Sequence, residues 1–126
     1  MKFLNLTQHQ CTSEQAAEGL LGITGEDLNS LRQLLTFETL PTKQEIEHRA
    51  RLIALLATRY STIKNRVERA MIGGAPFLMS ALEAALLDVG IEPFYAFSKR
   101  ESFEETQLDG SVKKVNIFKH CGFVQV

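Results

Sequence analysis

The turn Gly73-Gly74-Ala75-Pro76 gives the strongest indication of a binding site in this sequence. Pro76 is typical of the first residue of a helix, and Ala75, which would then be the N-cap, has no side-chain acceptor. The first N–H groups of a helix have no partner within it, so those of the two residues after Pro76 are expected to be free. Gly73 and Gly74 would allow a ligand close to this backbone. We therefore predict a phosphate or carboxylate site here; a hydrated strand-to-helix turn is the alternative.

A second polar segment, Ser98 to Ser102, follows a strand-like run at Pro93–Phe97. Lys99 and Arg100 would neutralise a phosphate, because arginine can hold it with two hydrogen bonds and lysine acts as a point charge. The hydroxyl of Ser98 would assist a reaction at that phosphate. The same composition is also typical of an ordinary exposed loop, and this alternative stays open.

A third polar segment begins with Thr7, Gln8 and His9, directly after a strand-like run at residues 2–6. Imidazole titrates near neutral pH, so His9 is a candidate general acid or base, with Thr7 and Gln8 as ligand-binding neighbours. A histidine with a purely structural role is the alternative.

The elements that would position these segments alternate along the chain. Strands are predicted at residues 2–6, 34–37, 70–72, 93–97 and 112–118. Helices are predicted at 13–21, 43–59 and 76–89, and another begins at Thr24 with Leu28, Leu31 and Leu35 on its apolar face. Threonines that can cap the first three helices stand at positions 12, 24 and 42. An Asp109-Gly110 pair predicts a tight hairpin before the last strand. The pattern predicts a single α/β domain over residues 1–126, with a Rossmann-like three-layer architecture, a mainly parallel sheet and a C-terminal β-hairpin.

In such sheets, ligands bind beyond the carboxyl ends of the strands, near the point where the strand order reverses. Each of the three polar segments follows a predicted strand. We therefore expect all three at one edge of the sheet.

Composition excludes several classes of protein. The chain has 126 residues, a net charge of −1 and 44% hydrophobic residues, which are the values of a globular domain and not of a disordered or duplex nucleic-acid-binding protein. No apolar run approaches the roughly 20 residues of a membrane span, and the N-terminus lacks the pattern of a signal peptide. We expect a cytoplasmic protein without a membrane partner. Cys11 and Cys121 are expected to be reduced thiols, and the pattern predicts no metal or other cofactor.

The N-terminal segment resembles that of a known family. Leu6-Thr7-Gln8-His9 ends a predicted strand, and Thr12-Ser13-Glu14-Gln15 opens the helix that follows. In these residues the chain is similar to small CRISPR-associated ring-nuclease-like proteins. The resemblance implies a Rossmann-like fold related to CRISPR-associated sensor domains, which bind cyclic oligoadenylate across a dimer. No catalytic motif of that family can be transferred residue by residue.

We expect the chain to bind a phosphorylated nucleotide, for which the resemblance implies cyclic oligoadenylate, and to form a homodimer. The two glycines before Ala75, together with Lys99 and Arg100, would hold phosphate. His9 or Ser98 would assist a metal-independent ring-nuclease reaction, in which a ribose 2′-hydroxyl attacks the neighbouring phosphate. The alternative is a non-catalytic dimeric interaction module that pairs through its hairpin and apolar C-terminus. A hydrolase with a cysteine nucleophile is a third hypothesis, although neither cysteine lies in a phosphate-loop motif.

Overall fold

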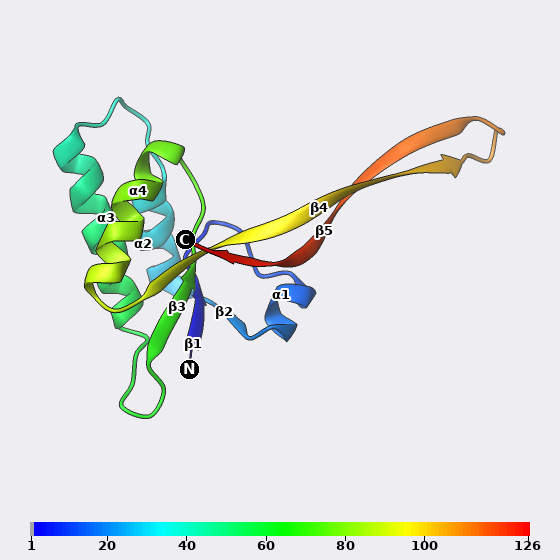
Figure 1. Cartoon of the computed structure of the whole chain (residues 1–126). Coiled ribbons are helices and arrows are strands. Elements are labelled where there is room, and N and C mark those ends of the chain that lie inside the picture. The colour runs from blue at the N-terminus through cyan, green and yellow to red at the C-terminus, as the bar shows by residue number, and fades with distance from the viewer. Residues whose placement is uncertain (1) are drawn as a thin grey trace.

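The computed structural model describes residues 2–126, which form a five-stranded sheet with flanking helices (Figure 1). The strands are β1 (Lys2–Asn5), β2 (Leu20–Gly22), β3 (Val67–Met71), β4 (Glu92–Thr106) and β5 (Val112–Gln125). The helices are α1 (Ser13–Ala17), α2 (Gly25–Leu35), α3 (Lys43–Thr58) and α4 (Pro76–Asp88). The strand order is β2-β1-β3-β4-β5, in which only the β4–β5 pair is antiparallel. The predicted Rossmann-like α/β fold with a C-terminal β-hairpin is confirmed.

The two faces of the sheet are covered unequally. Helices α2, α3 and α4 pack on one face, around a core that includes Leu4 and Ile53. The other face carries Phe3 and Met71, and α1 lies on that side (Figure 1). Gln15 of α1 places its amide nitrogen 3.8 Å from the sulfur of Met71. Phe3 and Leu4 thus face opposite layers, as the two-residue period of a strand requires. Within the described part of the chain, no helix has the length and apolar character needed to cross a membrane.

The predicted end of the first helix, at residue 21, is wrong. α1 stops at Ala17, and Gly19 follows in the left-handed region with a φ of +96°. The next residues form β2, where Leu20 is almost fully buried and pairs with Phe3 of β1. Burial of Leu20 against the sheet therefore outweighs its fit to the helical pattern.

The strand predicted at residues 34–37 is also wrong. α2 continues through Leu35, which is buried in the same core as Leu31, one turn earlier. Phe37, just beyond the helix, packs edge-on against the ring of Phe77 with centroids 4.9 Å apart. The apolar run therefore belongs to the end of a helix and to the tertiary contacts of Phe37.

β4 and β5 extend far beyond the rest of the sheet. β3 pairs with β4 only up to Phe94, whereas β4 and β5 stay paired to Thr106 and Val112. The two strands form a long twisted ribbon that leaves the body of the protein (Figure 1); we call its residues 97–122 the arm. The predicted hairpin turn is confirmed at its tip, where Gly110 has a φ of +85° and Asp109 accepts a hydrogen bond from the Ser111 N–H at 2.9 Å. The strand predicted to end at residue 97 is wrong, because β4 continues through the polar segment.

Candidate functional site

The strand order reverses between β1 and β3. The chain leaves β1 toward β2 on one side and leaves β3 toward β4 on the other, so the carboxyl ends of β1 and β3 flank the place where α/β sheets bind ligands. Thr7 follows β1 and Gly73 follows β3; a Cβ atom on Gly73 would lie 3.5 Å from Cγ2 of Thr7. The structure therefore brings two of the three predicted polar segments into contact.

The segment after β1, residues 7–11, is fixed by a buried asparagine. Asn5 Oδ1 accepts hydrogen bonds from the Thr7 N–H at 2.9 Å and the Thr7 hydroxyl at 2.6 Å. Asn5 Nδ2 donates to the carbonyl of His9 at 2.6 Å. Both Asn5 and Thr7 are buried, while the side chain of His9 is exposed. The bends that present His9 to solvent are thus held from below by one side chain of β1.

Sequence reasoning missed the role of Asn5. A signal was present, because an asparagine inside an otherwise apolar strand has to find hydrogen-bond partners once it is buried. Its partners, however, are backbone groups of the next bend, and their positions depend on the folded chain.

A cavity of about 350 Å³ lies beside this segment. Gln8, His9 and Arg32 are among the polar residues that line it, and Leu20 and Leu28 are among the apolar ones. A volume of this size is at the lower end of the range for small-molecule sites, which typically combine apolar walls with a few polar groups. The cavity therefore has the size and the mixed lining of a site for a small organic ligand.

Arg32 supplies a guanidinium to this cavity, and no motif in the sequence marks it as a binding residue. It lies in the last turn of α2, is exposed, and forms no ion pair within residues 2–126. Thr36 donates its hydroxyl to the Arg32 carbonyl at 2.7 Å and accepts a weak hydrogen bond from Gln8 at 3.4 Å. The end of α2 and the segment after β1 are therefore in contact where Arg32 projects.

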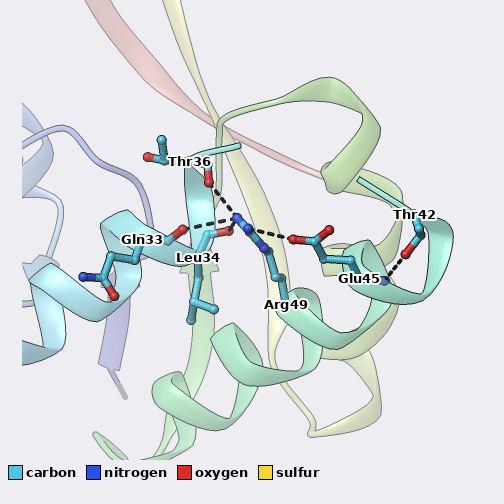
Figure 2. Close-up of polar contacts among 6 residues, drawn as sticks. All are labelled: Gln33, Leu34, Thr36, Thr42, Glu45 and Arg49. Carbon is cyan, nitrogen blue, oxygen red and sulfur yellow. Dashed lines mark hydrogen bonds and ion pairs between the residues drawn. The ribbon is translucent and has the colours of Figure 1, made fainter. Parts of the chain in front are cut away.

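The C-terminus of α2 is neutralised by Arg49 of α3 (Figure 2). Arg49 Nη1 donates to the carbonyl oxygens of Gln33, Leu34 and Thr36 at 3.2, 3.4 and 2.6 Å. Its Nη2 pairs with Glu45 at 2.8 Å. The carbonyl groups at a helix C-terminus carry partial negative charge, so this guanidinium removes a feature that would repel an anion near Arg32.

The start of α4 is only partly as predicted. Ala75 is the N-cap and forms no side-chain hydrogen bond, which confirms that this helix lacks a side-chain cap. The N–H of Leu78 is not free, since it donates to the Ala75 carbonyl at 3.0 Å. The N–H of Phe77 has no backbone acceptor among the described residues. Gly74, with a φ of +143°, turns the chain into the helix.

The three threonine caps also differ. Thr12 and Thr42 accept hydrogen bonds from the N–H groups of Gln15 and Glu45, as predicted. Thr24 is the N-cap of α2, but its hydroxyl forms no capping hydrogen bond, so that prediction is wrong. The residue instead lines the cavity.

The remaining predicted polar segment, Ser98 to Ser102, lies away from the cavity. Ser98, Lys99 and Arg100 are exposed residues of β4, on the arm, opposite His120, Lys119 and Phe118 of β5. None of the three lines the cavity. The expectation that they follow the end of a strand is wrong, because β4 continues to Thr106. Their ligand-binding and catalytic roles stay predictions.

The base of the arm is attached to α1 through His120. The His120 side chain is 4% exposed; its Nε2 lies 3.0 Å from a carboxylate oxygen of Glu18, and its ring packs on Phe123. Phe123 in turn contacts Phe3 edge-on, with ring centroids 4.6 Å apart. His120 therefore holds the arm to the body and does not reach the cavity. Across the described residues, no group of three or more His, Cys, Asp or Glu side chains could hold a metal ion.

Comparison with known proteins identifies the family of this chain and nothing more specific. The model of the uncharacterised protein MJ1673 family matches residues 1–124, so the chain belongs to this family. No curated protein and no solved structure matches it.

Proposed function

We propose that this member of the MJ1673 family binds a phosphorylated nucleotide in the cavity between the segment after β1 and the start of α2. One observation supports this more than any other: amide, imidazole and guanidinium groups stand beside an apolar wall at the carboxyl end of the sheet. A nucleotide has a flat, largely apolar base and a charged phosphate, so it needs both kinds of surface within a few ångströms.

Each part of the nucleotide has a counterpart in the lining. Leu21 and Leu28 offer the apolar surface for the base, since both line the cavity and are at least partly exposed. The amide of Gln8 can both donate to and accept from the polar edge of the base. Arg32 supplies the planar set of donors that holds a phosphate with two hydrogen bonds. Because Arg32 is free of ion pairs within residues 2–126, no internal carboxylate has to be displaced first.

We propose cyclic oligoadenylate as the nucleotide, on the strength of the resemblance at residues 6–15. One nucleotide unit would occupy the cavity, and the next phosphate would extend past Thr7 toward Gly73 and Gly74. The N–H of Phe77 offers a donor there, at the N-terminal end of a helix. This gives the predicted glycine turn a secondary role in binding, after that of Arg32.

Turnover would follow the general course of metal-independent RNA cleavage. The 2′-oxygen of a ribose attacks the adjacent phosphorus, the bond from phosphorus to the 5′-oxygen breaks, and a 2′,3′-cyclic phosphate forms. His9 would accept the proton of the 2′-hydroxyl, and the departing 5′-oxygen would take a proton from water. Arg32 would stabilise the additional negative charge on the phosphate oxygens.

Isothermal titration calorimetry with AMP and with cyclic tri-, tetra- and hexa-adenylates tests binding. We expect saturable heat with at least one of the cyclic ligands. Arg32→Met should weaken binding at least about tenfold, the effect of losing one charge-assisted hydrogen bond. Arg51→Met is the matched control, since Arg51 is an exposed arginine of α3 outside the cavity. Absence of heat with every ligand at about 1 mM would contradict the proposal.

A second variant separates binding from catalysis. His9→Gln keeps a polar side chain but removes the base, so it should bind the ligand and fail to cleave it. Chromatography of the reaction products shows the linear oligonucleotide with a cyclic phosphate end if cleavage occurs. Binding without cleavage by the unchanged protein would leave the site in place and contradict the ring-nuclease step.

The second candidate function is a non-catalytic interaction module, and the arm favours it. The apolar C-terminus predicted to pair with another chain is only partly available, because Phe123 already packs on Phe3. Val124 and Val126 are exposed. Dimer formation together with an absence of nucleotide binding would support this candidate over the first.

A further inference from the structure

Within residues 2–126, the strands of the arm pair only with each other, and the arm is held to the body at its base, where His120 contacts Glu18 of the segment after α1. Beyond Phe94, β4 no longer pairs with β3, and its second edge is free among the described residues. Large apolar side chains are exposed along the ribbon, among them Phe97, Phe103 and Phe118 at 54%, 47% and 75%. An isolated two-stranded ribbon is marginally stable in water, and a free strand edge is a template for pairing with another strand. These features indicate a surface that another chain completes.

Hydrogen bonds at the base of the arm show which residues of β4 point their backbone groups to the free edge. The Phe94 carbonyl accepts from the Ile72 N–H at 2.8 Å, on the side away from β5. The Pro93 carbonyl accepts from the Val126 N–H at 3.4 Å, on the β5 side. Because these directions alternate along a strand, the even-numbered residues of β4 direct their N–H and C=O groups to the free edge.

The sequence along this edge is complementary to itself. Around Ser102, two cations and two carboxylates are arranged with opposite sign: Lys99 and Arg100 before it, Glu104 and Glu105 after it. Such a pattern favours a symmetric contact between identical strands, because every residue away from the two-fold axis meets a different residue of the other copy.

We propose that a second copy of this chain pairs antiparallel with the free edge of β4, with the two-fold axis at Ser102. Lys99 then lies opposite Glu105 of the second copy, and Arg100 lies opposite Glu104 of the second copy. The two-fold axis repeats each contact, so four pairs of opposite charge form. Two arms together make a four-stranded antiparallel sheet, which has the number of strands that stable sheets usually need.

The register follows from two independent features. In this pairing the even-numbered residues Arg100, Ser102 and Glu104 face even-numbered residues, so their outward backbone groups can exchange hydrogen bonds. The nearest registers with the same property place Glu101 against either Glu101 or Glu105 of the second copy, and like charges directly opposite are destabilising. Backbone direction allows every second register, and among the nearest of these, charge favours the one with Ser102 on the two-fold axis.

The edge of β5 does not have this property. Lys113, Lys114 and Lys119 lie along β5, and the strand has no carboxylate within Val112–Gln125. Two copies joined through β5 would bring cations together.

The contact through β4 also buries apolar surface. The Phe103 side chains of the two copies become diagonal neighbours on one face of the four-stranded sheet, and this surface is exposed in the single chain.

Sedimentation equilibrium of the whole chain tests the proposal, and it does not depend on nucleotide binding. We expect a dimer at tens of micromolar. Lys99→Glu places like charges across both symmetric contacts and should raise the dimer Kd at least about tenfold. Lys119→Glu is the matched control: it reverses one charge on the same face of the arm but on β5, opposite Lys99. The control should change the Kd less than about threefold.

A rescue variant tests the pairing itself. Glu105 faces Lys113 inside the hairpin, so both have to be exchanged to keep the arm intact. The triple variant Lys99→Glu, Glu105→Lys, Lys113→Glu restores opposite charges within and between chains and should return the dimer. Failure of this rescue, or equal loss with Lys119→Glu, would overturn the proposed register.

Cross-linking locates the two-fold axis. In a Cys121→Ser background, Ser102→Cys should form a disulfide-linked dimer on oxidation, because the two residues face each other across one strand spacing. Asn116→Cys is the control; Asn116 pairs with Ser102 within the hairpin, so its two copies would lie about 14 Å apart, too far for a disulfide. A monomer at every concentration, or equal cross-linking of both variants, would overturn the proposal.

Discussion

The side-chain amide of Asn5 donates to the backbone carbonyl of His9 at 2.6 Å, across a bend that begins directly after β1. The buried side chain of Asn5 therefore determines the position of the exposed His9. This relationship joins the core of the fold to the cavity, because the same segment carries Gln8 and forms one wall. Loop geometry at such an edge depends on internal hydrogen bonds as much as on the residues that a ligand would touch.

Asn5→Leu removes these hydrogen bonds while keeping the volume of the side chain. The Thr7 N–H loses its acceptor, and the His9 carbonyl keeps only the weaker hydrogen bond from the Thr7 hydroxyl at 3.3 Å. We therefore expect a loss of about 1–3 kcal/mol in the free energy of unfolding, measured with urea. The exposed Gln10→Leu is the control and should change it by less than about 0.5 kcal/mol. Equal effects of the two substitutions would mean that Asn5 does not hold the bend.

Gly74→Ala and Gly73→Ala separate backbone strain from close packing. Gly74 has a φ of +143°, which L-residues rarely adopt, so alanine there should cost about 1–3 kcal/mol. At Gly73 a Cβ would meet only Thr7, at an ordinary contact distance of 3.5 Å. We expect that variant to change stability by less than about 1 kcal/mol. Thermal unfolding of both proteins compares them, and a reversed order would contradict the turn geometry.

Arg49→Lys tests how α2 is held against α3. Lysine keeps the charge but lacks the planar donors that reach three carbonyl groups, and it lacks the guanidinium face that lies 4.2 Å from the ring centre of Phe37. We expect destabilisation by about 1–3 kcal/mol in urea. Arg51→Lys, two residues further along α3, should be neutral. A neutral Arg49→Lys would show that the capping contacts contribute no net stability.

The two tyrosines provide a pH test. Burial and a hydrogen bond to Asp27 raise the pKa of Tyr60, and burial and a hydrogen bond to Glu83 raise the pKa of Tyr95. Both folded-state pKa values lie above the value of 10.0 for an unperturbed tyrosine, so their stabilising contribution is complete below pH 10.0 and is lost as the pH rises through them.

Because the chain contains two tyrosines and no tryptophan, absorbance in the long-wavelength tyrosinate band reports on these two groups alone. Tyrosinate absorbance of the folded protein should rise later in an alkaline titration than that of the urea-unfolded protein. Tyr95→Phe should reduce the loss of stability above pH 10.0. Coincident titrations of the folded and unfolded protein would contradict both hydrogen bonds.

Features set by neighbouring residues could be predicted from the sequence. The uncapped start of α4 follows from Ala75 and Pro76, and the hairpin turn follows from Asp109 and Gly110, because each depends on local backbone preferences. The alternation of strands and helices predicted the layered fold for the same reason.

Features that depend on contacts between residues far apart in the sequence could not be predicted. Arg32 joins the cavity because α2 ends beside the segment after β1, and no local pattern marks this. Lys99 and Arg100 followed a plausible strand end, but pairing with β5 keeps β4 extended through them. Leu20 fits the helical pattern of the residues before it, but its burial beside β1 favours a strand.

The most direct test of the account is an amide NMR titration of the isotope-labelled whole chain with cyclic tetra-adenylate, followed by the same titration with AMP. We expect the largest chemical-shift changes at residues 7–11, Thr24 and Arg32, with smaller changes at Gly73 and Gly74. Spectra that stay unchanged up to about 1 mM ligand, or changes confined to the arm, would contradict a nucleotide site in this cavity.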